Sequence, residues 1–127
     1  MSHTVTLKLQ LSDPKCLTLA CRALSLPHQT GRQSVRMFSG NTVEADFTLQ
    51  LPGWRYPVGI NTQTGEVSLD NFNGHWGDMK ELHRLAQEYA LQVAEQEPSV
   101  QDLLFRGWSA TRVQQPNGVV QLVLEGN

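Results

Sequence analysis

The stretch TVEADFTLQL, residues 42–51, decides the fold of this chain. Apolar and polar side chains alternate along it one by one: Val43, Ala45, Phe47, Leu49 and Leu51 against Thr42, Glu44, Asp46, Thr48 and Gln50. A repeat of two residues predicts a β-strand with one face in the core and one in water. Glu44 and Asp46 lie on the solvent-exposed face. We expect them to be solvated there and to discourage aggregation through the sheet edge.

Short turns follow this strand and predict an antiparallel meander. Pro52-Gly53 reverses the chain, residues 55–61 continue it as a strand, and residues 62–65 lead to a further strand at 66–70. Strands that are joined by connections this short pair with their sequence neighbours in antiparallel fashion.

A long amphipathic helix is predicted after the turn-rich residues 71–77. Asp78 and Glu81, three positions apart, form an Asp-containing analogue of the capping box. Apolar residues then recur at intervals of three and four, which places one stripe against the sheet. The stripe consists of Leu82, Leu85, Ala86, Tyr89, Ala90, Val93 and Ala94. Pro98 ends the helix.

The C-terminal residues predict a helical turn and a hairpin. Ser99 caps a short helical turn at 100–106, and Gly107 supplies the left-handed conformation that closes it. Residues 108–114 and 119–124 then form two strands around Pro116-Asn117-Gly118.

The N-terminal third begins with a strand, because residues 4–11 alternate between polar and apolar. A helix over 14–24 follows, with Ser12 or Asp13 as its cap and Pro14 in its first turn. Its expected core face is Cys16, Leu17, Ala20, Ala23 and Leu24. Residues 25–34 show no period and predict a polar loop, and residues 35–38 predict a short strand.

The predicted order is therefore β-α-β-β-β-β-α-β-β, which belongs to the α+β class. We expect one domain over residues 1–127, with a single mainly antiparallel sheet and two main helices packed on one face. The uncovered face or an unprotected edge would accept a partner protein or a second copy of the chain, so a homo-oligomer stays open.

Composition limits the possible functions. The 127 residues include 10 Lys and Arg against 12 Asp and Glu, a formal net charge of −2. A chain without a basic run lacks the electrostatic attraction on which general nucleic-acid binding depends, so we expect no nucleic-acid partner.

Cys16 and Cys21 are five positions apart on a predicted helix, so we expect that they do not form a disulfide. Together with the polar opening of the chain, this predicts a reducing, cytoplasmic location, and no apolar run suggests a membrane role.

Several segments resemble one family in their order along the chain. They are residues 1–3, the turn PGWRYP at 52–57, the junction DNFNGHWGD at 70–78, Tyr89-Ala90, Gly107-Trp108 and the last strand GVVQLVL at 118–124. Together they resemble the hypothetical chloroplast reading frame 35 family, also called domain of unknown function 1257, over nearly the whole chain. The resemblance implies a small soluble protein that is often encoded near an AAA-type ATPase, and it implies no established reaction. This chain departs from the family between Tyr89 and Gly107, where it is longer and carries Pro98, and at Trp108, where other members often have Phe or Tyr.

Two aromatic turns are the candidate site. An antiparallel sheet can bring the turn after the central strand close to the entrance of the long helix. The candidate binding residues are Trp54, Arg55, Tyr56, Asn71, Phe72, Asn73, His75 and Trp76. Three interpretations stay open: both tryptophans fill the core or an interface, the turns form a protein-contact surface, or they form a cleft for a small ligand.

No catalytic residues, metal ligands or cofactor are predicted. His75 beside Asp78 could suggest a base that is oriented by a carboxylate, but Asp78 is more simply a helix cap. His75 and His83 are eight positions apart, which is not a metal-ligand spacing. The leading hypothesis is therefore a noncatalytic interaction module, with an AAA-type ATPase as the partner that the resemblance suggests. The alternative is a small-molecule binder or enzyme that uses the aromatic cleft around Trp54 and Trp76.

Overall fold

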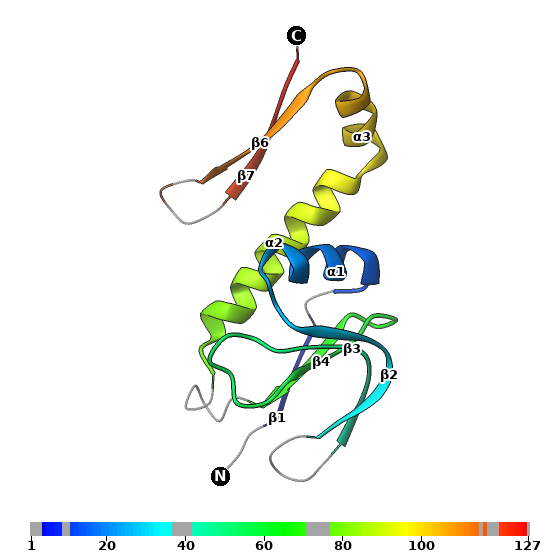
Figure 1. The fold of residues 1–127 in the computed structure, drawn as a ribbon, viewed down its shortest axis with the longest axis vertical. Coiled ribbons are helices and arrows are strands. Elements are labelled where there is room, and N and C mark those ends of the chain that lie inside the picture. Colours follow the sequence, from blue (N-terminus) through cyan, green and yellow to red (C-terminus); the bar gives the residue numbers. More distant parts are fainter. Residues whose placement is uncertain are drawn as a thin grey trace. The chain divides into compact units, whose positions relative to one another are not determined.

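A computed structural model of the chain describes residues 4–8, 11–36, 42–70, 77–114, 116 and 120–126. The chain divides into two compact units, Met1–Tyr89 and Ala90–Asn127. The α+β class is confirmed: helices and antiparallel strands are combined throughout (Figure 1).

The first unit is built on a five-stranded sheet in the order β1-β5-β4-β3-β2. The strands are β1 (Thr4–Lys8), β2 (His28–Arg36), β3 (Thr42–Leu49), β4 (Val58–Asn61) and β5 (Glu66–Asp70). Each neighbouring pair is antiparallel, so the predicted meander of β3, β4 and β5 is confirmed. Strand β4 is shorter than predicted and begins at Val58, because residues 52–57 are used in the turn.

Helices α1 (Pro14–Ala23) and α2 (Met79–Gln96) begin at the predicted caps. The Asp13 carboxylate accepts hydrogen bonds from the amides of Lys15 (3.0 Å) and Cys16 (3.3 Å). The Asp78 carboxylate accepts one from the Lys80 amide at 2.9 Å. Each cap satisfies amides that have no partner inside the helix. The core face of α1 differs slightly from the prediction, because Ala23 is exposed and Cys21 is buried.

The core of the first unit lies between the sheet and these helices. A hydrogen bond of 3.0 Å from the Asp13 amide to the Tyr89 hydroxyl joins the start of α1 to α2. Fully buried side chains come from all of these layers, and they include Leu17, Phe47, Val58, Ile60, Val67, Leu82 and Leu85.

The prediction of a polar loop at 25–34 is wrong, because His28–Arg36 forms the edge strand β2. The pairing with β3 shifts between Thr30 and Gln33, and Gly31 within this bulge has a φ of +102°. An extra residue interrupts the two-residue alternation that identifies strands in a sequence. Beyond the bulge, β2 and β3 curve together (Figure 1), and Val35 and Ala45 pack over Gly59. Residues 37 and 38 of the predicted short strand lie outside the described residues.

The second unit contains the end of α2, helix α3 (Pro98–Phe105) and the hairpin of β6 (Ser109–Gln114) and β7 (Val120–Glu125). Pro98 ends α2 as predicted, but it also opens α3, and the Ser99 cap is wrong because Glu97 holds the N-cap position. Gly107 closes α3 with a φ of +96°.

The expectation of a single sheet is also wrong, since β6 and β7 form a separate two-stranded sheet. Local contacts hold the hairpin to the helices that precede it. The Trp108 amide donates to the Leu103 carbonyl at 3.0 Å, and Arg112 Nε lies 2.8 Å from Glu95 Oε1.

Asp46 is partly buried rather than solvated, and it connects β3 to the turn after β4. Its carboxylate accepts hydrogen bonds from the Thr62 amide at 2.8 Å and from the Thr62 hydroxyl. Burial raises the pKa of Asp46, but the hydrogen bonds from Thr62 outweigh burial and hold the pKa below its ordinary value of 3.8. The bonds to Thr62 therefore favour the ionised carboxylate.

We expect Thr62→Val to lower the free energy of unfolding by about 1 kcal/mol at pH 7, the usual contribution of one hydrogen bond. A folded-state pKa below the unfolded value gives stability that is present above the unfolded pKa and is lost as the pH falls through the folded pKa. The deficit should therefore shrink below about pH 4. Urea unfolding at pH 7 and pH 3 tests this, with Thr42→Val at an exposed β3 position as the control. A deficit of equal size at both pH values would contradict it.

Candidate functional site

The turn that carries Trp54, Arg55 and Tyr56 is anchored by the tryptophan. Trp54 is only 5% exposed, so it is a core residue and not part of an open surface. Its indole Nε1 donates to the Asp78 carbonyl at 3.0 Å, at the entrance of α2. The ring lies against Gly77, where a Cβ atom would stand 2.4 Å from the Trp54 ring. The turn and the helix entrance therefore meet, as the sequence led us to expect, but through a buried contact.

Burial of Trp54 changes the candidate binding surface. Arg55 is exposed and Tyr56 is half-buried, so these two remain accessible. The other candidates, Asn71, Phe72, Asn73, His75 and Trp76, lie outside the described residues. Of the three interpretations of Trp54, the structure favours the core residue.

A cleft of about 800 Å³ begins beside this turn and extends along β2 and β3. Its apolar lining comes from Pro27, Val35, Leu49, Tyr56 and Pro57, and its polar lining from His28, Gln29, Gln33, Ser34, Thr48 and Gln50. The size falls in the range of small-molecule sites, roughly 300–1,000 Å³. The sequence prediction included Tyr56 but missed the other lining residues. The lining residues of β2 were missed because that strand was predicted as a loop.

Hydrogen bonds fix the polar side chains at this cleft. The Thr48 hydroxyl donates to Gln33 Oε1 at 3.1 Å. The Gln50 amide donates to the carbonyls of Leu51 (3.2 Å) and Trp54 (2.5 Å), which joins the cleft to the anchored turn. The His28 ring stacks on Phe47 with 5.7 Å between centroids, and its Nδ1 donates to the Leu26 carbonyl at 3.0 Å. These side chains are therefore held in place around the opening.

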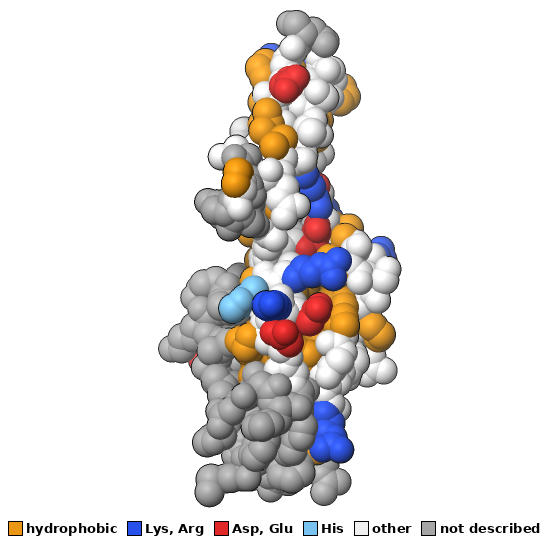
Figure 2. Space-filling model, turned by 90° about the vertical axis from the view of Figure 1, so that its left-hand side faces the viewer, with side chains coloured by type: hydrophobic (Ala, Val, Ile, Leu, Met, Phe, Trp, Pro, Cys, Tyr) orange, Lys and Arg blue, Asp and Glu red, His pale blue; other side chains and the backbone are white. Residues whose placement is uncertain are grey.

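The second unit exposes apolar side chains. Phe105 at the end of α3 is 92% exposed, Trp108 is 38% exposed and Val113 is 39% exposed. No residue of α3 is buried, and every residue of β6 is exposed. Figure 2 shows apolar side chains on the surface of this part of the chain. The sequence prediction missed this surface, because spacing does not reveal that an apolar residue lacks a neighbour.

The two thiols are free and buried, so the prediction that they do not pair is confirmed. Burial raises the pKa of Cys21 to about 11. Burial, a hydrogen bond from Cys16 Sγ to the Asp13 carboxylate (3.3 Å) and the charge of that carboxylate raise the pKa of Cys16 to about 11. Because the thiolate is the nucleophilic form, neither cysteine suits covalent catalysis at neutral pH.

The described residues hold no cluster of three or more His, Cys, Asp or Glu side chains suited to a metal ion. Within the same part of the chain, no helix has the length and apolar character needed to cross a membrane.

Comparisons with family models, with curated proteins and with solved structures found no match to this chain. The resemblance to the hypothetical chloroplast reading frame 35 family stays a prediction.

We expect Gly77→Ala to lower the free energy of unfolding by about 1–3 kcal/mol, because the added methyl group must displace the Trp54 ring. The two positions should also be coupled, so Gly77→Ala should cost less in a Trp54→Leu background. Urea unfolding of both single variants and the double variant measures this coupling. Additive effects would mean that the indole does not pack on Gly77.

We expect both cysteines of the native protein to resist alkylation by iodoacetamide at pH 8, because the thiols are protonated and buried. Both should react rapidly in 6 M guanidinium chloride, which serves as the control. Mass spectrometry over time gives the readout. Fast labelling of either cysteine in the native protein would contradict the buried, high-pKa environment.

Proposed function

We propose that this protein is a noncatalytic interaction module, and that its second unit docks on a partner protein. The observation that carries the proposal is the exposure of Phe105, 92% of whose surface faces solvent. A large aromatic side chain on a helix end loses favourable burial energy in water, and binding to a partner recovers it.

The architecture of the second unit supports this role. Leu91 is the one residue classed as buried among the described residues from Ala90 onward. An isolated two-stranded hairpin is marginally stable in water and needs packing against another element. Arg112 and Glu95 connect the hairpin to α2 through a partly exposed ion pair, and a single ion pair near the surface contributes little stability. A partner that covers α3 and the hairpin would supply the missing core.

The nature of the exposed side chains favours a protein as the partner. Phe105 and Trp108 are aromatic, and aromatic residues are enriched at the energetic centres of protein interfaces. The net charge of −2 gives no long-range attraction to nucleic acid. The family resemblance makes an AAA-type ATPase the first partner to test. The cytoplasmic location expected from the cysteines is part of the same proposal.

The alternative function, a small-molecule binder or enzyme, needs a different site from the one first expected. Trp54 is buried and therefore cannot line an aromatic cleft. Tyr56 does line the cleft along β2 and β3, and this observation keeps a ligand-binding role as the second candidate.

We expect Phe105→Gln to reduce binding of the native partner at least 10-fold without destabilising the protein by more than about 0.5 kcal/mol, since Phe105 is 92% exposed. The tagged wild-type chain and the variant are compared by co-purification from native cells with quantitative mass spectrometry. Arg22→Ser, at an exposed α1 position of the first unit, is the matched control. Equal capture of every partner by Phe105→Gln and wild type would refute the docking role of the second unit.

A further inference from the structure

We propose that the cleft along β2 and β3 binds an uncharged, mainly apolar small molecule that carries one or two hydrogen-bonding groups. This site belongs to the first unit and is independent of the docking surface around Phe105. Three features of the cleft lead to this ligand class: its walls, its lack of ionised side chains and the state of the adjoining sheet edge.

The walls suit a ring system. The Tyr56 ring and the prolines Pro27 and Pro57 line the cleft, and Leu49 and Val35 add buried aliphatic surface. Leu49 is 2% exposed and Val35 is 5% exposed, so both belong to the folded core and give the cleft a fixed floor. Flat and rigid apolar side chains offer van der Waals contact to a planar ligand at little cost in conformational entropy.

The electrostatics favour a neutral ligand. No Asp, Glu, Lys or Arg of the described residues is among those that line the cleft. A charged ligand would lose hydration there without gaining an ion pair, which is unfavourable. The amide nitrogens of Gln33 and Gln50 already donate to backbone carbonyls. The groups offered to a ligand are therefore the Gln50 side-chain oxygen and the Gln29 amide, which carries both donors and an acceptor. They suit a ligand with a single N–H, hydroxyl or carbonyl group.

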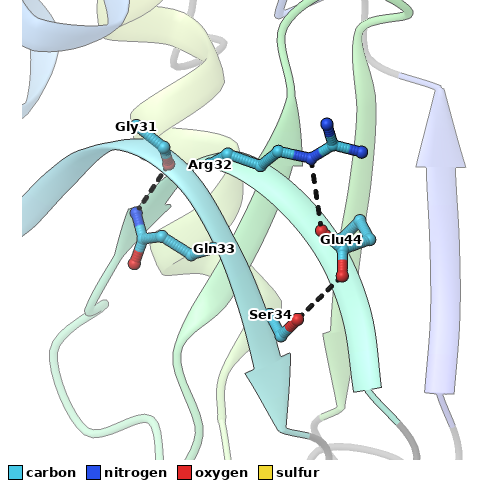
Figure 3. Close-up of polar contacts among 5 residues, drawn as sticks. All are labelled: Gly31, Arg32, Gln33, Ser34 and Glu44. Atoms are coloured by element: carbon cyan, nitrogen blue, oxygen red, sulfur yellow. Dashed lines mark hydrogen bonds and ion pairs between the residues drawn. The ribbon is translucent and has the colours of Figure 1, made fainter.

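The sheet edge at the cleft is closed to another strand. The Gln33 side-chain amide donates to the backbone carbonyls of Gly31 (3.2 Å) and Gln29 (3.3 Å), and Figure 3 shows the first of these bonds. An added strand would need such carbonyls as acceptors. The bulge at Gly31 and the neighbouring Arg32–Glu44 ion pair (3.6 Å, Figure 3) also interrupt a straight edge. A compact molecule therefore fits this cleft better than an extended peptide.

Two fluorescent probes that share one aromatic skeleton test the proposal. N-phenyl-1-naphthylamine is neutral, and 8-anilinonaphthalene-1-sulfonate carries one added negative charge. We expect saturable binding of the neutral probe with a 1:1 stoichiometry, and a dissociation constant at least 10-fold higher for the sulfonate. Equal affinity for the two probes would overturn the assignment of a neutral ligand.

Two variants locate the bound probe. Gln29→Trp adds a large side chain at an exposed position that lines the cleft, and Tyr56→Ala removes part of a wall. Each should weaken binding of the neutral probe, the first at least 10-fold. Thr42→Trp, at an exposed position of β3 outside the cleft, is the matched control and should change the affinity less than 2-fold. Circular dichroism melts confirm that each variant is folded.

One result would relocate the probe and end the proposal. If folded Gln29→Trp and Tyr56→Ala bind the neutral probe as the wild type does, while Phe105→Gln weakens it, then the probe sits on the second unit and the cleft is not a ligand site. This outcome leaves the docking role of Phe105 untouched, so the two proposals fail or succeed separately.

Discussion

The contact between the Trp54 indole and the entrance of α2 is the constraint on which the first unit depends. The ring fills the space above Gly77 and donates a hydrogen bond to the Asp78 carbonyl, so one side chain connects the β3–β4 turn to the helix. Asp78 meanwhile caps α2 with its carboxylate. Because the buried indole fixes the turn, Arg55 and Tyr56 take defined positions beside it. The cleft wall that Tyr56 forms follows from this anchor.

The edge strand β2 carries a local irregularity next to the cleft. The bulge at Gly31 bends β2, and the curved half of β2 and β3 brings Val35 and Ala45 over Gly59. Gln33, just after the bulge, bonds to Thr48 with its oxygen and to two β2 carbonyls with its nitrogen. The same side chain therefore closes the edge to other strands and lines the cleft. Bulges often have this double effect near functional sites.

The two units differ in how completely they bury their apolar side chains. The first unit buries Phe47, Leu82 and Leu85 completely, as an independent core should. The second unit leaves Phe105 in solvent and buries nothing on α3. This difference is the physical basis on which we propose docking for the second unit and ligand binding for the first.

The sequence by itself determined the α+β class, the meander, the caps of α1 and α2 and the free cysteines, because each depends on neighbours within a few positions. Strict alternation identified β3, and Asp13 and Asp78 act on amides two or three residues ahead. Only the tertiary structure decided that His28–Arg36 is a strand, that the hairpin forms its own sheet, and that Trp54 is buried while Phe105 is exposed. A bulge interrupts the two-residue alternation of apolar and polar side chains by which a strand is recognised. Burial depends on contacts between residues that are far apart in the chain. For the same reason the sequence indicated Tyr56 but not the cleft that it lines.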